Sequence, residues 1–343
     1  MKTLRLRLTS AVIQADPALL EAAAILRSGG LVAFPTETVY GLGANALSAH
    51  AVEKIFAAKQ RPHWDPVIVH VAEIAEARKL TTSWPDAVER LAAAFWPGPL
   101  TMLLPRAAQI PDICTAGREK VGLRMPSHPV AMALIAAAGV PVAAPSANRF
   151  GHTSPTTAEH VLADLDGRID AILDAGSCTI GVESTVLDPT SDPPIIYRPG
   201  GITLEQIRQV LGTALGNVIV AERKISDDRP PESLESPGLG IRHYAPRARV
   251  ILVENEAELF SVVEREARNH HVGVLLPAGW KSPGEGVAVL PWGSWKEPES
   301  LARDLYQQMR ALDDRKIDVI VCPMPPPDGI GMAIRDRLRK AAK

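Results

Sequence analysis

The stretch Gly30–Arg61, GLVAFPTETVYGLGANALSAHAVEKIFAAKQR, decides how the fold is interpreted. Its apolar residues Leu31–Phe34 predict a short strand that ends at Pro35, because proline cannot donate to a central ladder. Thr36–Gly43 follow as a predicted polar loop, in which glycine lets the backbone approach a ligand closely. A strand that leads into such a loop is a common ligand site in α/β proteins, although an ordinary strand–helix connection has the same pattern.

Two cations, Lys59 and Arg61, stand at the end of the helix that follows this loop. Lysine is a point charge and arginine is a planar fork, and both suit phosphate oxygens. The alternative is a solvated helix end, where cations also complement the helix dipole. The pair alone leaves both interpretations open.

The composition is that of a globular protein of about two domains. The chain has 343 residues, 46% of them hydrophobic and 22% charged, with a formal net charge of −2. That charge excludes a global field directed at nucleic acid or anionic lipid. The cysteines Cys114, Cys178 and Cys322 form no CxxC pair, and the first residues are too polar for a secretory signal. We therefore expect a cytoplasmic protein without a membrane span.

Segments typical of strands and helices alternate loosely in the first two thirds of the chain, and several strands follow one another directly. This pattern predicts an α/β fold with a mixed, twisted sheet flanked by helices. Sequence signals also mark helix starts. These are Asp16-Pro17 and two capping boxes, Thr156 with Glu159 and Thr203 with Gln206.

Composition divides the chain into three parts. Residues 1–212 contain the mixed sheet, and residues 213–246 are rich in Pro, Ser, Gly and charge, which predicts an interdomain linker. Residues 247–343 alternate between strand and helix patterns. They predict a smaller, Rossmann-like α/β domain that has no glycine fingerprint.

Other polar residues stand within or just after predicted strands. Arg124 and Arg198 each precede a proline at a strand end, and a buried strand tolerates arginine only when it is paired, so a bound anion is one interpretation. Ser146 and Asn148 lie in the loop after a strand, where ordinary turn residues are the alternative. His70 lies on a strand, where a core histidine is more common than a ligand-binding one.

Several motifs are absent. The chain has no GxxxxGK[ST], GxGxxG, GxSxG or HExxH motif and no clustered Cys and His. We therefore expect no metal held by the protein alone. The cations and hydroxyls fit a reaction between bound substrates, in which the protein supplies positioning and electrostatics.

Taken in order, the segments LVAFPTETVYGLG, Lys59-x-Arg61, PVIVHV, VGLRMP, PSAN, SPT and ESTVLD resemble the YrdC-domain family. The linker with RHYAP and the α/β segment after it resemble the two-domain branch of that family. The resemblance covers nearly the whole chain. Each motif is weak by itself, but seven in order are highly specific.

The resemblance implies a nucleotidyltransferase. Such an enzyme makes L-threonylcarbamoyladenylate and pyrophosphate from L-threonine, bicarbonate and ATP, for threonylcarbamoyladenosine modification of tRNA. The threonine carbamate would attack the α-phosphate, so charge on the phosphate oxygens would need cations. Mg²⁺ would enter with ATP, and a separate transfer complex acting on tRNA would receive the product.

The resemblance also implies roles for individual residues. Lys59, Arg61, Ser146 and Asn148 would be catalytic. The ATP set would be Lys59, Arg61, Asp65, Ser146, Asn148, Ser154, Arg198 and His243. The threonine set would be Thr38, His70, Arg124, Ala144 and Ser184. Arg124 would pair with the threonine carboxylate, and His243 would make the linker a lid, unless it is only a docking contact.

Five positions depart from the family pattern. Gln60 stands in place of glycine, and Asp65 in place of asparagine, where an added carboxylate would repel a triphosphate unless magnesium bridges them. Phe150 replaces a serine, and Gly240-Ile241 replaces Lys-Tyr before RHYAP. These departures affect nucleotide affinity and lid closure, not the reaction class.

Two other functions compete with the synthase. One is a module that binds double-stranded RNA or tRNA, which the net charge of −2 and the lack of interleaved basic and aromatic runs disfavour. The other is a carbamoyltransferase accessory domain. Proteins of that kind usually carry zinc-finger cysteines and an acylphosphatase segment, and this chain has neither.

Overall fold

The computed structural model describes residues 2–10, 12–212, 217–221 and 244–342, which form two compact units. The first unit contains most of the chain up to residue 221. The second contains the C-terminal residues from Tyr244 onward, together with Gly151–Ser154 and Ile180–Val182. Each unit has a sheet and an apolar core of its own.

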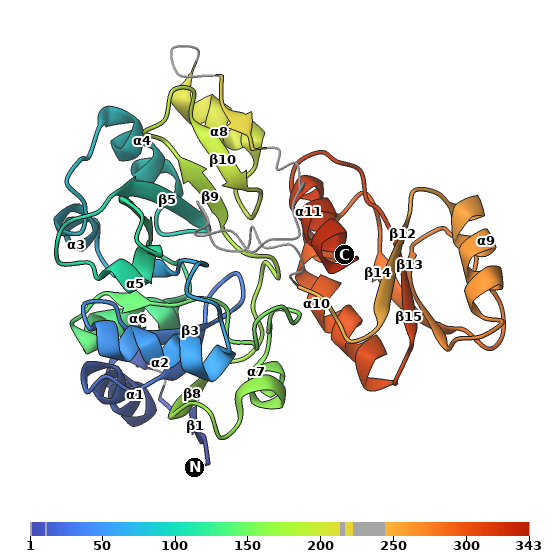
Figure 1. Ribbon diagram of the computed structural model, residues 1–343, viewed down its shortest axis with the longest axis horizontal. Coiled ribbons are helices and arrows are strands. Elements are labelled where there is room, and N and C mark those ends of the chain that lie inside the picture. Colours follow the sequence, from blue (N-terminus) through green and yellow to red (C-terminus); the bar gives the residue numbers. More distant parts are fainter. Residues whose placement is uncertain (1, 11, 213–216, 222–243, 343) are drawn as a thin grey trace. The chain divides into compact units, whose positions relative to one another are not determined.

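The described part of the first unit contains an eleven-stranded mixed sheet with the order β1-β8-β2-β3-β7-β4-β6-β5-β9-β10-β11 (Figure 1). Parallel and antiparallel pairs both occur, as the sequence predicted. The strands are β1 Leu4–Arg7, β2 Val32–Pro35, β3 Tyr40–Asn45, β4 Ile68–His70, β5 Leu100–Pro105, β6 Lys120–Arg124, β7 Val142–Ala143, β8 Ala171–Asp174, β9 Thr185–Asp188, β10 Ile195–Arg198 and β11 Ile219–Val220.

Helices cover both faces of this sheet. Alternation along β2 places Val32 and Phe34 in the apolar core under α1 and α6, and Ala33 in the larger core under the other helices. The helical segments are η1 Ile13–Ala15, α1 Pro17–Arg27, α2 Ala49–Lys59, α3 Ile74–Lys79, α4 Asp86–Phe95, α5 Asp112–Thr115, α6 Pro129–Ala138, α7 Ala158–Leu165 and α8 Leu204–Leu211.

β2 and β3 form an antiparallel hairpin whose turn is residues 36–39, with Pro35 opposite Tyr40. The interpretation of all of Thr36–Gly43 as a loop is therefore wrong. A Cβ atom on Gly43 would lie 2.8 Å from Cε1 of Phe34 and 2.9 Å from Cγ1 of Val142. Glycine is needed at this position for close packing within the sheet, and it does not mark an irregular loop.

The expected helix caps have mixed outcomes. Asp16 accepts a hydrogen bond from the amide of Ala18, and Thr203 forms a capping box with Gln206, so both are confirmed. The box at Thr156 and Glu159 is wrong by one residue. The cap of α7 is Thr157, whose side chain accepts from the amide of His160.

The second unit has a parallel sheet with the order β12-β15-β13-β14. Its α9 packs a leucine and two valines on one face of the sheet, and α10 and α11 lie on the other (Figure 1). This is the predicted small α/β domain. Its elements are β12 Arg249–Val253, α9 Glu256–Glu266, β13 Val272–Pro277, β14 Ala288–Gly293, α10 Pro298–Asp314, β15 Val319–Pro323 and α11 Gly331–Ala341.

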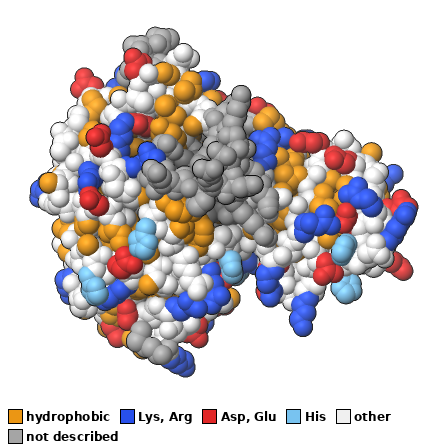
Figure 2. Space-filling view, in the orientation of Figure 1, with side chains coloured by type: hydrophobic (Ala, Val, Ile, Leu, Met, Phe, Trp, Pro, Cys, Tyr) orange, Lys and Arg blue, Asp and Glu red, His pale blue; other side chains and the backbone are white. Residues whose placement is uncertain are grey.

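Most of the predicted linker, residues 213–246, lies outside the described residues. Its described part includes β11, which pairs in parallel with β10 and so extends the sheet of the first unit. On the face shown in Figure 2, acidic and basic side chains are mixed over each unit, in keeping with the net charge of −2. In the described parts of the chain, no helix is both long enough and apolar enough to cross a membrane.

We predict that Gln60→Gly stabilises the protein. Gln60 follows α2 with φ 55° and ψ 39°, a left-handed conformation that costs about 1–2 kcal/mol in a residue with a Cβ. The lower conformational entropy cost of glutamine offsets part of this, so the expected net gain is about 0.5–1 kcal/mol in urea denaturation.

The matched control is Gly139→Gln at the end of α6. Gly139 has φ 66°, and a Cβ atom added to it would meet no described atom within 4 Å, so only the backbone cost should change there. This variant should lose about as much stability as Gln60→Gly gains. A destabilised Gln60→Gly variant would contradict the argument.

Candidate active site

The first unit buries an unusual set of polar side chains, from its strands, from the turns between them and from the end of α2. Buried polar groups normally need a partner, and buried charges are rare unless they are paired. The buried set includes Thr36, Glu37, Thr38, Lys59, Arg61, Asp65, His70, Thr101, Arg124, Asn148, Ser184 and Arg198. Most of the residues predicted for the site are therefore interior residues, held by the fold.

Arg124 ends β6 and is joined to the β2–β3 turn. Its Nη2 donates to Oε1 of Glu37 at 2.7 Å and to Oγ1 of Thr38 at 3.0 Å. Thr36 shapes the turn, since its hydroxyl donates to the carbonyl of Val39 at 2.7 Å. The anion expected beside the buried arginine is thus supplied by the protein, and the sequence had given Glu37 no role.

Two buried atoms beside this ion pair have no hydrogen-bond partner among the described residues. They are Oε2 of Glu37 and Nδ1 of His70. His70 lies directly opposite Arg124 in the parallel pairing of β4 with β6. Each unsatisfied buried polar atom costs about 1–3 kcal/mol, so this cluster has the character of a binding site.

His70 is electrically neutral at physiological pH. Burial, assisted by the positive charge of Arg124, lowers the pKa of its imidazole to about 3. A neutral ring offers one donor and one acceptor, which suits a hydroxyl or an amine better than an anion. This does not conflict with the predicted place of His70 in the threonine set.

Ser184 and Arg198 form a second hydrogen-bonded group. Arg198 donates from Nε and Nη2 to the carbonyl of Ser184, at 3.1 and 3.0 Å. The Ser184 hydroxyl lies 2.8 Å from that of Thr101 on β5, which pairs with both β6 and β9. Thr101 was missed from the sequence, where it stands inside an apolar strand without any motif.

Lys59 is fully buried at the end of α2. Its Nζ donates to the carbonyl of Ser146 at 2.5 Å and also to the carbonyl of Asn148. Burial, with a contribution from the charge of Arg61, holds the pKa of Lys59 well below its usual range. The alternative of a solvated helix end is therefore wrong for Lys59, which joins α2 to the loop after β7.

Arg61 is also buried, and it pairs with Asp65. Nη2 of Arg61 lies 2.9 Å from Oδ2 of Asp65, and its Nε and Nη2 donate to the carbonyls of Asp65 and Pro66 at 2.9 and 2.7 Å. The carboxylate that departs from the family pattern is thus balanced by a guanidinium. Repulsion of a triphosphate by Asp65 is correspondingly reduced.

The loop after β7 connects the group around Arg124 with the group around Lys59. Its Ala144 donates its amide hydrogen to Ile68 of β4 at 2.8 Å, and Ser146 forms a bridge with Gly41 of β3. The hydroxyl of Ser146 donates to Oδ1 of Asn148 at 2.5 Å. β3 therefore begins at the turn that Arg124 contacts, and its Gly41 pairs with the loop whose carbonyls accept hydrogen bonds from Lys59.

Two predicted residues stand apart from these groups. Ser154 is buried but belongs to the second unit, and His243 lies outside the described residues. Within the part of the chain that is described, no group of three or more His, Cys, Asp or Glu side chains could hold a metal ion.

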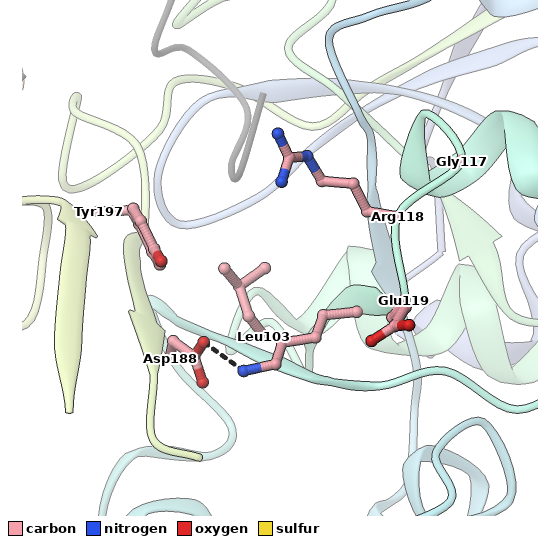
Figure 3. Close-up of a pocket in the computed structure, with 7 residues that line it drawn as sticks. Leu103, Gly117, Arg118, Glu119, Asp188 and Tyr197 are labelled. Carbon is pink, nitrogen blue, oxygen red and sulfur yellow. Dashed lines mark hydrogen bonds and ion pairs between the residues drawn. The ribbon is translucent and has the colours of Figure 1, made fainter. Parts of the chain in front are cut away.

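A separate hollow of about 390 Å³ lies beside β6, β9 and β10 (Figure 3). It contains none of the predicted site residues. Lys120 and Asp188 form an ion pair of 2.5 Å within it, shown by the dashed line. Its lining residues are Leu103, Gly117, Arg118, Glu119, Lys120, Asp188 and Tyr197.

Two family models match the chain. Residues 24–200 match the model described as telomere recombination, that of Sua5, YciO and YrdC. Residues 202–343 match the model described as the C-terminal domain of threonylcarbamoyl-AMP synthase.

Curated relatives are similar over most of the chain. A threonylcarbamoyl-AMP synthase from Bacillus subtilis is 45% identical over 95% of this chain and 93% of its own length. One from Pyrococcus abyssi is 42% identical over 94% and 93%. A shorter Mycobacterium tuberculosis protein, named a putative threonylcarbamoyl-AMP synthase, is 37% identical over 58% of this chain and 91% of its own.

A solved structure is also similar. It is the crystal structure of P. abyssi Sua5 complexed with L-threonine, which is 39% identical to this chain. The TM-score is 0.89, over 100% of this chain and 98% of that one.

We predict that His70 makes stability depend on pH. Because its pKa is lowered in the folded state, protons bind the unfolded state first as the pH falls below about 6.5. Stability should then fall until the pH reaches about 3. When the pH falls from 7 to 5, the free energy of unfolding measured in urea should decrease by roughly 2 kcal/mol more for the native protein than for His70→Asn.

The control is His50→Asn, which replaces an exposed histidine of the same unit. It should follow the native protein over the whole pH range. If His70→Asn instead had the same pH profile as the native protein, the proposed neutral state of His70 would be refuted.

Proposed function

The chain belongs to the Sua5–YciO–YrdC family, with a threonylcarbamoyl-AMP synthase C-terminal domain, and on that basis we propose that it is a threonylcarbamoyl-AMP synthase. The reaction would convert L-threonine, bicarbonate and ATP into L-threonylcarbamoyladenylate and pyrophosphate. The observation that carries this proposal is the buried cluster of Arg124, Thr38, His70 and Ser184, in a chain 39% identical to a Sua5 complexed with L-threonine.

Threonine binding is assigned to this cluster. The Arg124 guanidinium, already fixed by Glu37, is a preorganised partner for a carboxylate. Neutral His70 and the hydroxyls of Thr38 and Ser184 can exchange hydrogen bonds with an amine and a hydroxyl. By resemblance, Ala144 completes the threonine set. It lies against β3, where a Cβ atom added to Gly41 would be 3.3 Å from the Cβ of Ala144.

ATP binding is assigned to the group formed by Lys59, Ser146 and Asn148. The Lys59 ammonium has three donors, two of which meet the carbonyls of Ser146 and Asn148, so one remains for a phosphate oxygen. A bound triphosphate would favour the charged form of Lys59, which burial alone disfavours. By resemblance, Arg61, Asp65, Ser154, Arg198 and His243 complete the ATP set.

The reaction requires the protein to position its substrates and to stabilise negative charge. Threonine nitrogen attacks carbon dioxide and loses a proton, or attacks bicarbonate with loss of water, to give a carbamate. A carbamate oxygen then attacks the α-phosphate while the bond to pyrophosphate breaks and pyrophosphate leaves. Negative charge grows on phosphate oxygens, which buried cations stabilise more strongly than solvated ones do. Magnesium would enter with the nucleotide and neutralise part of the triphosphate charge.

The place in tRNA modification follows from the product. A carbamoyl-adenylate is an activated donor, so a transfer complex acting on tRNA would consume it. We place the reaction in the cytoplasm. A direct tRNA-binding role is the second candidate, and the face shown in Figure 2 does not favour it, since charges of both signs are mixed there.

The reaction itself is tested with purified protein, ATP, magnesium and bicarbonate. We expect pyrophosphate release that depends on L-threonine, together with formation of a threonylcarbamoyladenylate identified by mass spectrometry. Omission of bicarbonate is the control. Pyrophosphate release that is equally fast without threonine would exclude the proposed function.

Arg124→Ala should weaken threonine binding. A hydrogen bond to a charged group is worth about 1.5–3 kcal/mol, so the dissociation constant should rise about 10- to 150-fold in calorimetry. Arg124→Lys keeps the charge but not the fork, and its affinity should lie between the two. The control is Lys120→Ala, on the same strand but in the hollow of Figure 3. Unchanged threonine affinity in Arg124→Ala would disprove this role.

A further inference from the structure

Glu37 is a buried acid of the first unit to which the proposed function gives no contact with substrate. The residue is 5% exposed, and Oε1 of its carboxylate accepts a hydrogen bond from Nη2 of Arg124 at 2.7 Å. The other oxygen, Oε2, is buried and has no hydrogen-bond partner among the described residues. One half of the carboxylate is therefore satisfied inside the protein, and the other half is not.

The turn that carries Glu37 is fixed by hydrogen bonds on both sides. The hydroxyl of Thr36 donates to the carbonyl of Val39 at 2.7 Å, and the carbonyl of Glu37 accepts from the amide of Thr179 at 3.2 Å. Rotation of the carboxylate toward solvent would break its ion pair with Arg124. A buried polar atom without a partner calls for an explanation, and a bound molecule with a donor at Oε2 would provide one.

The charges of this group indicate what kind of molecule fits it. Arg124 and Glu37 cancel one another, and His70 beside them is neutral, so these three side chains carry no net charge. A simple anion would meet a guanidinium that Glu37 has already neutralised. A zwitterion keeps the balance, because its carboxylate can face Arg124 while its ammonium faces Glu37. Free α-amino acids are zwitterions of this kind.

The hydrogen-bonding capacity of the group leads to the same class of ligand. Oε2 of an ionised Glu37 can only accept, and an ammonium can only donate. Nδ1 of His70 is the second unsatisfied atom of the group, and a hydroxyl can pair with it in either tautomer. With its carboxylate on Arg124, threonine has one ammonium and one hydroxyl left, which match these two atoms.

We propose that Glu37 binds the amino group of the substrate and thereby selects α-amino acids over other carboxylates. This inference rests on the proposed function, because it takes L-threonine as the ligand of this group. The nitrogen held by Oε2 is the atom that becomes carbamoylated. It still carries a hydrogen after the carbamate has formed, so the contact can persist through that step.

The test compares two ligands by calorimetry in Glu37→Gln. One is L-threonine, and the other is its hydroxy-acid analogue, in which a hydroxyl replaces the amino group. The variant keeps an oxygen that can accept from Arg124 but puts an amide NH₂ where Oε2 was, and that group cannot accept from an ammonium. The dissociation constant for threonine should rise about tenfold or more, the loss expected for a hydrogen bond to a charged group.

Affinity for the hydroxy acid should change in the opposite direction. This ligand is an anion, and without the charge of Glu37 the Arg124 guanidinium attracts it more strongly. Its hydroxyl can also accept from the new amide. The native preference for threonine should therefore disappear, whereas a purely structural role of Glu37 would weaken both ligands alike. Glu37→Asp, which keeps the charge, should recover part of the preference.

The matched control is Asp188→Asn in the hollow of Figure 3. Asp188 is also a buried acid of the first unit, and it pairs with Lys120 on the strand that carries Arg124, so its variant should keep the native preference. An unchanged preference in Glu37→Gln would overturn the proposal, and so would equal binding of both ligands by the native protein. Because these titrations need no turnover, absence of threonine-dependent pyrophosphate release would count against the synthase function alone.

Discussion

The ion pair between Arg124 and Glu37 is the interaction on which the arrangement of the site depends. It joins the end of β6 to the β2–β3 turn, two elements 87 residues apart in sequence, through a bond of 2.7 Å. A buried pair gains little net stability, because both charges lose their hydration, yet removal of one partner costs about 3–5 kcal/mol. The pair is therefore better explained by the position it gives Arg124 and Thr38 than by any contribution to folding.

The same logic extends to the second group of cations. Lys59 is held by two carbonyls and Arg61 by Asp65, so both side chains are fixed in position before any anion arrives, although burial alone disfavours the charged form of Lys59. Charges fixed in a poorly hydrated interior need little reorganisation when negative charge develops beside them. Asp65 is consistent with this scheme. Its ion pair keeps the Arg61 guanidinium in place, and its carboxylate neutralises part of the positive charge there.

The sequence predicts most of the site residues, but it does not predict which residues they pair with in the fold. It predicted that an arginine on a buried strand must be paired, and Arg124 is, but Glu37 stands among polar turn residues where nothing distinguishes it. It also gave the strand ending at Pro35 and the caps at Asp16 and Thr203, which depend on neighbours within a few residues. β3 was missed because Gly43 looks like a loop residue until Phe34 and Val142 are placed against it. Long-range packing of this kind leaves no local signal.

The two units differ in the polar side chains that they contribute to the described groups. The cations and hydroxyls of the two described groups all come from the first unit. The shorter relative is matched over 91% of its own length by only 58% of this chain, which is too little to include both family models. The second unit, whose sequence shows alternating strands and helices but no motif of its own, supplies none of the side chains of these two groups.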